Sequence, residues 1–221
     1  MQKVITGNNM DVLPTLTKYK FDLIFADPPY IGVDKGYRSY FMDWFPLAKQ
    51  LLKTNGTIII TVGVARRFLM DIDNLETPTD IYIYLKNGSG KITYWKDTPS
   101  FNWEVILDYH YSKDRYIDKN ICSTGIFKNY KWTNQFMGKR EASWHPTPKH
   151  IDFMVDIVNM FCPVNGLVLD PFLGSGTTLV ACKKTGRNGV GIELNDKWSV
   201  LCDERIKNTS STPTIDSFLT I

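Results

Sequence analysis

Short apolar runs with the length of buried strands alternate with segments of helical periodicity along most of this chain. The run Phe21–Ala26, for example, is almost continuously apolar and ends in a turn signal, as a fully buried strand does. Alternation of strands and helices at this spacing predicts crossover connections and therefore a parallel sheet in an α/β domain. The expected strands are residues 21–26, 57–62, 81–85, 103–109, 167–170 and 189–193, and the expected helices are residues 41–53, 65–72, 151–161, 177–184 and 196–206.

The composition is that of an ordinary globular protein. With 221 residues, 43% hydrophobic and 22% charged, the chain is long enough for one α/β domain with a modest insertion. The residues after Met1 form no signal-peptide core, and no apolar stretch approaches the length of a membrane span. These features predict a soluble protein of the cytoplasm that does not contact a membrane.

The four cysteines do not predict a metal site. They form no C-x-x-C pair and no zinc-like grouping with the three histidines. Apolar neighbours surround most of them, so we expect small buried side chains in a reducing compartment. The cysteines are Cys122, Cys162, Cys182 and Cys202.

A Gly-x-Gly turn, Gly174-Ser175-Gly176, follows the strand expected at residues 167–170. Such a turn lets the backbone approach a ligand closely because no Cβ intrudes, and open parallel sheets bind ligands at the carboxyl ends of their strands. Glu193 follows at the spacing of an acid that binds ribose hydroxyls. Leu179 occupies the third-glycine position of a dinucleotide motif, so the pattern favours a nucleoside cofactor without a pyrophosphate. Alone, the Gly-x-Gly pattern is equally typical of a simple tight turn.

The strand expected at residues 21–26 runs directly into Asp27-Pro28-Pro29-Tyr30. This motif suits a flat substrate that carries an amine, because the Asp27 carboxylate and the Pro28 carbonyl can accept its two N–H groups. The prolines add no backbone donors that would compete at such a site, and Tyr30 can stack on an extruded base. The alternative interpretation is a turn that ends the strand, with the acid as a local cap and the prolines as breakers.

Together, Asp27-Pro28-Pro29-Tyr30 and residues 168–178 and 191–195 resemble the S-adenosylmethionine-dependent DNA amino-methyltransferases, in the permuted arrangement called the β class. The resemblance implies an α/β, Rossmann-like class I methyltransferase fold. In that fold a mostly parallel central sheet has helices on both faces and an inserted recognition region. The implied division is a catalytic half at 1–86, a target-recognition insertion at 87–144, a cofactor-binding half at 145–208 and a tail at 209–221.

The resemblance also implies S-adenosylmethionine as the cofactor. Two positions depart from the family's pattern: Asn8 stands where members usually carry an Asp that reaches the cofactor's adenine, and His150 replaces the last proline of a His-Pro-Thr-x-Lys-Pro element. Asn can accept a hydrogen bond but carries no charge. The implied cofactor-binding residues are Asn8, Asp27, His145, Thr147, Lys149, Asp170, Pro171, Phe172, Gly174, Ser175, Gly176, Thr177, Thr178, Glu193, Leu194 and Asn195.

The identity of the first catalytic residue predicts the base. In this family Asp at that position usually accompanies N6-adenine methylation, and Ser usually accompanies N4-cytosine methylation. The resemblance therefore implies an adenine-N6 methyltransferase that acts on a flipped base of double-stranded DNA, with Asp27, Pro28, Pro29 and Tyr30 as catalytic residues. N4-cytosine methylation and a catalytically silent, methyltransferase-like nucleic-acid-binding subunit remain alternatives, and the sequence leaves the oligomeric state open.

Positive charge gathers in the middle of the chain. Residues 111–140 hold seven basic and two acidic residues, a charge of +5 that leaves −2 of the net +3 for the rest. Aromatic residues interleave with these cations, a pattern typical of phosphate contacts combined with base stacking. The expected DNA-binding residues are Lys113, Arg115, Lys128, Lys131, Lys139 and Arg140 from this segment, and Lys35 and Arg38 from a glycine-containing loop after the catalytic motif.

Overall fold

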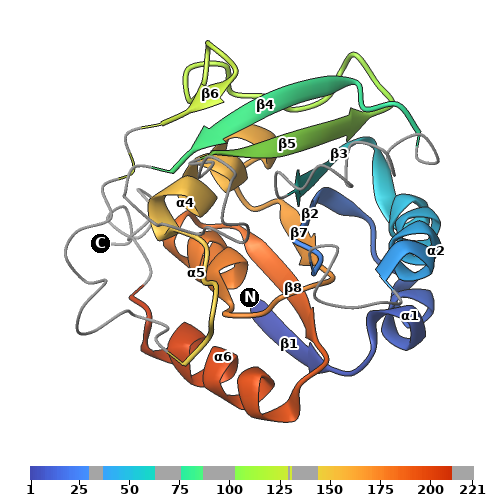
Figure 1. Ribbon diagram of the computed structural model, residues 1–221, viewed down its shortest axis with the longest axis vertical. Helices are drawn as coiled ribbons and strands as arrows, with labels where there is room; N and C mark the ends of the chain where they lie inside the picture. Colours follow the sequence, from blue (N-terminus) through green and yellow to red (C-terminus); the bar gives the residue numbers. More distant parts are fainter. Residues whose placement is uncertain (30–36, 63–75, 87–102, 129, 131–143, 211–221) are drawn as a thin grey trace, which may run out of the picture.

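The computed structural model describes residues 1–29, 37–62, 76–86, 103–128, 130 and 144–210. In these residues an eight-stranded sheet has the order β1-β8-β7-β2-β3-β5-β4-β6 (Figure 1). The strands are β1 (Gln2–Thr6), β2 (Phe21–Ala26), β3 (Leu52–Val62), β4 (Asp80–Leu85), β5 (Trp103–His110), β6 (Ile126–Phe127), β7 (Leu167–Asp170) and β8 (Asn188–Glu193).

The sheet is mostly parallel, as predicted. Neighbouring strands run parallel in every pair that the described residues form, except the two pairs that involve β5. β5 lies between β3 and β4 and runs antiparallel to both. Alternation of strands and helices does not reveal a reversed strand, because hydrophobic periodicity carries no information on strand direction.

Helices cover both faces of the sheet (Figure 1). α1 and α2 lie on one side, and α4 and α5 lie on the other. Because successive side chains of a strand point to opposite faces, neighbouring residues of β2 enter different cores: Ile24 joins the α2 side, whereas Phe25 joins the α4 side. The helices are α1 (Asn9–Val12), the 3-10 helix η1 (Leu13–Leu16), α2 (Tyr37–Gln50), α4 (Ile151–Phe161), α5 (Thr177–Lys184) and α6 (Asp196–Asn208).

Aromatic packing joins α4 to the β4–β6 end of the sheet. The Phe153 ring stacks on the Tyr84 ring with centroids 4.0 Å apart and planes 13° apart, and the Phe127 ring meets Phe153 edge-on. All three side chains are almost completely buried. Burying a Phe side chain contributes about 2–3 kcal/mol, so this cluster anchors the strands that follow β3 in the sheet.

Several expected boundaries differ from the structure, most of them by one or two residues, and the largest shifts lie around α2 and β3. The helix expected at residues 41–53 ends at Gln50, and β3 begins at Leu52 rather than at residue 57. Asn55-Gly56, a pair typical of turns and helix ends, lies inside β3, where a Cβ on Gly56 would stand 2.8 Å from the Phe21 carbonyl oxygen. This close approach of β2 to β3 explains the glycine.

The middle of the chain contributes to the sheet itself. β5 and β6 both lie within residues 87–144, the segment expected as a target-recognition insertion. The division into halves, insertion and tail stays a prediction. Within the segment expected as the insertion, β5 is an internal strand of the sheet. The helix expected at residues 65–72 lies outside the described residues. None of the described helices is long and apolar enough to cross a membrane.

Candidate active site

The sheet brings the two sequence motifs together. β2 and β7 are parallel neighbours with Ile24 opposite Leu169, so the residues that follow these strands emerge at the same edge. Asp27 directly follows β2, and Asp170 ends β7. This edge is formed by the carboxyl ends of parallel strands, which is where sheets of this kind bind their ligands.

Asp27 is held from two sides. The Thr61 hydroxyl donates a hydrogen bond to Asp27 Oδ1 at 2.6 Å, and Lys149 Nζ lies 2.9 Å from the same oxygen. The Asp27 side chain keeps 22% of its surface exposed. A carboxylate oriented in this way can accept hydrogen bonds from a substrate amine at the edge of the sheet.

Lys149 reaches from Asp27 to a buried acid, Glu104. Lys149 Nζ lies 3.0 Å from Glu104 Oε2, and Lys86 pairs with the other oxygen of Glu104. Burial alone would raise the pKa of Glu104, but the Lys149 and Lys86 charges outweigh it and lower the pKa to about 2. Glu104 is therefore a carboxylate at neutral pH.

The glycine turn requires glycine at both positions. Gly174 and Gly176 have φ values of +54° and +77°, in the left-handed region that residues with a Cβ rarely adopt. A Cβ on Gly174 would stand 3.1 Å from His145 Nε2, and a Cβ on Gly176 would stand 3.1 Å from Cys202 Sγ. The turn therefore brings bare backbone to the edge of the sheet.

Glu193 ties this turn to the end of β8. One carboxylate oxygen accepts the Gly174 backbone N–H at 2.8 Å, and the other accepts the Asn195 N–H at 2.9 Å. Burial raises the pKa of Glu193, and these hydrogen bonds oppose that effect. Glu193 is thus placed beside the turn as the sequence predicted, while Leu194 is largely exposed next to it.

Asp170 forms hydrogen bonds to residues on both sides of the glycine turn. It accepts hydrogen bonds from the Phe172 backbone N–H at 2.9 Å and from the Thr178 hydroxyl at 2.6 Å. Complete burial raises the pKa of Asp170 to about 7, and the nearby charges of Asp27 and Glu193 act in the same direction. Three acids thus converge where β2, β7 and β8 end.

Residues from distant segments support the turn. Arg205 of α6 donates to the Ser175 carbonyl at 2.7 Å and to the Thr177 hydroxyl at 2.9 Å. The buried Asn9 side chain donates to the Pro171 carbonyl at 3.2 Å. These contacts hold the loop after β7 between α1 and α6.

Asn8 lies close to the end of β8, and its side chain caps the helix α1 that follows it. Its side-chain oxygen accepts the Met10 backbone N–H at 2.9 Å and so caps α1. The preceding Gly7 donates its N–H to the Glu193 carbonyl, which places Asn8 beside the acid. A contact between Asn8 and a cofactor stays a prediction.

His145 approaches the glycine turn, and the cofactor contact that the resemblance implies for it stays a prediction. Its ring centroid lies 4.6 Å from that of Trp198, and its Nδ1 accepts the Thr147 backbone N–H at 3.3 Å. Burial lowers the pKa of His145, and the nearby Asp27 carboxylate opposes this effect. The Thr147 side chain is exposed beside it.

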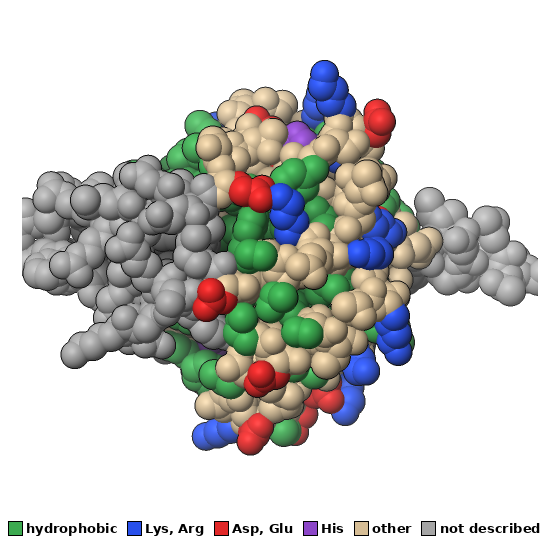
Figure 2. All heavy atoms as spheres, turned by 90° about the vertical axis from the view of Figure 1, so that its right-hand side faces the viewer, with side chains coloured by type: hydrophobic (Ala, Val, Ile, Leu, Met, Phe, Trp, Pro, Cys, Tyr) green, Lys and Arg blue, Asp and Glu red, His purple; other side chains and the backbone are tan. Residues whose placement is uncertain are grey.

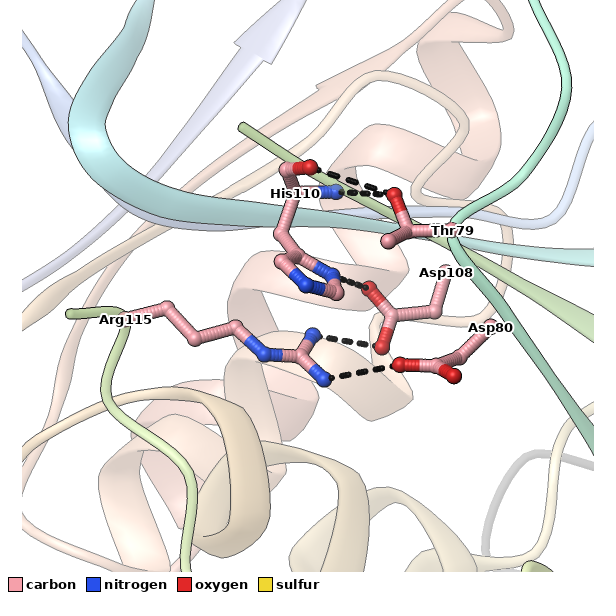
Figure 3. A network of polar contacts seen from close by, with 5 residues as sticks. All are labelled: Thr79, Asp80, Asp108, His110 and Arg115. Carbon is pink, nitrogen blue, oxygen red and sulfur yellow. Dashed lines mark hydrogen bonds and ion pairs between the residues drawn. The ribbon is translucent and has the colours of Figure 1, made fainter. Parts of the chain in front are cut away.

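One expected DNA contact, Arg115, is corrected by the structure. Its guanidinium is 8% exposed and lies between two acids, 2.5 Å from Asp108 Oδ2 and 3.3 Å from Asp80 Oδ2 (Figure 3). Asp108 is completely buried and needs a counter-charge, which explains why Arg115 turns inward. The guanidinium lies within the cluster of Asp80, Asp108 and His110 and pairs with both of its carboxylates.

The remaining basic residues are only partly described. Lys113 and Lys128 are exposed, in agreement with a role at the surface. Figure 2 shows lysines and arginines interspersed with acidic side chains on the face that carries α1 and α2, so this face is not uniformly basic. Tyr30, Lys35, Lys131, Lys139, Arg140 and the side chain of Arg38 lie outside the described residues, and the roles expected for them stay predictions.

Sequence reasoning missed four residues that shape the site: Thr61, Glu104, Asn9 and Arg205. Two of them carry a signal. Thr61 follows three isoleucines at the end of an expected strand, and Glu104 is the one charged residue of the otherwise apolar run 103–107. Asn9 and Arg205 lie in segments that look like solvated helix surface, and only the tertiary structure reveals their contacts.

Comparison with known proteins agrees with this geometry. The model of the DNA methylase family that covers N6 and N4 methyltransferases matches residues 21–199. The chain belongs to this family. It is an S-adenosylmethionine-dependent DNA methyltransferase, and both catalytic and cofactor motifs lie in the matched region.

The relatives of this DNA methylase include restriction-system enzymes. The type II methyltransferase M.HpaI of Haemophilus parainfluenzae is 26% identical, with 93% of this chain and 74% of the relative covered. M2.DpnII of Streptococcus pneumoniae is also 26% identical, with 91% and 89% covered.

Solved structures show the same fold. The M1.HpyAVI complex with S-adenosylmethionine is 25% identical and has a TM-score of 0.69, with 93% of this chain and all of that chain covered. The cytosine-N4-specific PvuII methyltransferase has a TM-score of 0.74 at 15% identity, with 95% and 88% covered. The class I methyltransferase fold is thus confirmed.

The site of this DNA methylase fits its cofactor. The two left-handed glycines turn the backbone at the edge of the sheet where such folds bind their ligands, and the Glu193 carboxylate lies beside this turn. The described turn offers carboxylates rather than a phosphate-binding lysine, which suits a nucleoside with a cationic centre. The candidate cofactor residues at this edge are Asp170, Gly174, Gly176 and Glu193.

Proposed function

We propose that this methyltransferase methylates the N6 amine of adenine in double-stranded DNA. The observation that carries the proposal is the position of Asp27, at the end of β2 beside the glycine turn and oriented by Thr61 and Lys149. In this family Asp at the first position of the catalytic motif usually accompanies adenine methylation. The target base lies inside the duplex, and so it must be extruded to reach this edge of the sheet.

The exocyclic amine of adenine is a poor nucleophile because its lone pair is delocalised into the ring. Asp27 accepts one N–H, and the Pro28 carbonyl accepts the other, which draws the nitrogen toward tetrahedral geometry. S-adenosylmethionine supplies an electrophilic methyl group on a sulfonium. The S–CH3 bond would break as the new N–C bond forms, leaving a neutral thioether, and the amine proton, acidic only from then on, would pass to water. Asp27 therefore contributes orientation and charge complementarity rather than strong basicity.

The proposal is tested by methylating plasmid DNA with the full chain and S-adenosylmethionine, followed by digestion to nucleosides and mass spectrometry. N6-methyladenine is the expected product. N4-methylcytosine would retain the mechanism and overturn the choice of base, for which the PvuII enzyme provides a precedent of the same fold. Absence of any methylated base, with cofactor binding verified by calorimetry, would refute the proposal.

A matched pair of variants on one strand tests the role of Asp27. Asp27→Asn is expected to abolish turnover while the cofactor still binds, although less tightly because a negative charge beside a cationic ligand is lost. The glycine turn itself is untouched. Asp22→Asn is the control: Asp22 lies at the other end of the same strand, where it pairs with Lys53 and accepts the Leu167 N–H. If Asp27→Asn were as active as Asp22→Asn and the wild type, Asp27 would have no role in the mechanism.

A further inference from the structure

Four charged side chains of alternating sign form a line that ends at the catalytic motif. Lys86 pairs with Glu104, Glu104 with Lys149, and Lys149 with Asp27. The side chains are 33% exposed at Lys86, 4% at Glu104, 12% at Lys149 and 22% at Asp27. The middle of the line is therefore buried, and one of its two open ends lies at the proposed substrate.

Glu104 provides the fixed point of this line. It belongs to β5, an internal strand with hydrogen-bonded neighbours on both sides, and its backbone lies opposite Tyr84 of β4. A buried carboxylate is tolerated only when its charge is paired, so Glu104 holds the two lysines strongly. β5, whose antiparallel direction the sequence did not reveal, thus places the Glu104 carboxylate next to Lys149 of the active site.

Lys149 needs such a fixed point. It lies in the loop that precedes α4, and its ammonium sits at the end of a flexible four-carbon chain. Simultaneous contact with Glu104 Oε2 at 3.0 Å and Asp27 Oδ1 at 2.9 Å restricts that chain to one conformation. Small errors in the position of a catalytic group are costly, since a 1 Å misplacement lowers rates about 100-fold.

We propose that Glu104 is a positioning residue for methyl transfer: it fixes the Lys149 ammonium, which in turn fixes the orientation of the Asp27 carboxylate. Lys149, expected from the family motif as a cofactor ligand, acts here on the catalytic acid. The inference rests on the proposed role of Asp27 but does not depend on which base is methylated.

The test is a double-mutant cycle with turnover and cofactor affinity measured separately. Glu104→Gln removes the charge and keeps the shape, and we expect kcat to fall about 10- to 100-fold with the S-adenosylmethionine Kd changed less than about threefold. Lys149→Met is expected to lower kcat at least as much. The double variant should be no slower than Lys149→Met, because Glu104 acts through Lys149.

Asp108→Asn is the matched control. Asp108 is a buried acid on β5, four residues or about 13 Å from Glu104, and it is paired with Arg115 instead of a lysine at the active site (Figure 3). This variant is expected to lose stability and to keep kcat within about twofold of the wild type at a temperature where both are folded. A loss of turnover equal to that of Glu104→Gln would show that any broken ion pair on β5 has this effect, and would overturn the proposal.

Two other results would overturn it. One is an unchanged kcat in Glu104→Gln together with an inactive Asp27→Asn. This outcome would refute the role of Glu104 but leave the proposed function intact. The other is a multiplicative loss in the double variant. If Glu104→Gln does not fold, Glu104→Asp keeps the charge and shortens its reach, and it should show the same separation of kcat from Kd. A wild-type protein that methylates no base would instead refute the proposed function.

Discussion

Removing one buried charge, with Asp170→Asn, is expected to stabilise this methyltransferase above neutral pH. Complete burial raises the pKa of Asp170 from 3.8 to about 7, so the folded state binds a proton in a pH range where the unfolded chain has lost it. The contribution of this group to the free energy of unfolding therefore decreases as pH rises from about 4 to about 7. At about 1.4 kcal/mol per pKa unit, the full decrease is about 4 kcal/mol.

Asn keeps the size of the side chain and removes the ionisation. Its oxygen can accept the Phe172 N–H, and its amide can donate to the Thr178 hydroxyl, so both hydrogen bonds have a replacement. Urea unfolding of the cofactor-free protein should show similar stabilities for the two proteins near pH 4. At pH 8 Asp170→Asn should be more stable by about 2–4 kcal/mol.

The difference between the two proteins at each pH is the decisive quantity, because the titration of all other groups cancels in it. A difference that does not change with pH, or a variant that is less stable at pH 8, would refute the reasoning. Calorimetry on the same samples should show weaker cofactor binding by Asp170→Asn. The substitution removes a negative charge from a site for a cationic ligand.

Three further perturbations have expected outcomes. Gly176→Ala, at φ +77° and against Cys202, should lower the free energy of unfolding by about 1–2 kcal/mol and weaken cofactor binding, as urea unfolding and calorimetry would show. Phe153→Ala, which removes the ring stacked on Tyr84, should lower it by about 3–5 kcal/mol in urea unfolding, and a loss below 1 kcal/mol would contradict the packing argument. The pKa of Glu104 is lowered from 4.5 to about 2, so its ion pairs stabilise the fold above pH 4.5 and this contribution is lost as pH falls toward 2. Acid unfolding of Glu104→Gln should accordingly depend less on pH in that window.

Much of the fold could be predicted because strands buried on both faces have a distinctive sequence pattern. Phe21–Ala26 and Leu167–Asp170 are nearly continuous apolar runs that end in Asp-Pro, and the structure confirms both as neighbouring strands. The glycine turn could be placed because positive φ and close approach select glycine. Local sequence thus sufficed wherever a single segment determines its own conformation.

Features that depend on two distant segments could not be predicted. The inward turn of Arg115 depends on Asp108 being buried, and a cation at a surface and a cation in an internal ion pair look alike in sequence. The continuation of β3 through Gly56 depends on the approach of Phe21 from the adjacent strand. Thr61 and Lys149 meet at Asp27 for the same reason, from β3 and from the loop before α4.

The position of β1 has a consequence for how the protein folds. Among the described strands its hydrogen-bonded neighbour is β8, and the Met1 amino group bonds to the Asn188 side chain 187 residues away. Contacts of such long sequence separation form slowly, since the entropy of closing a large loop is lost before the contacts can stabilise the fold. We therefore expect β1 to pair only after β8 has been synthesised, when β2, β3, β5 and β4 can already have assembled. The binding edge beside Glu193 would then be completed late, and cofactor binding would follow it.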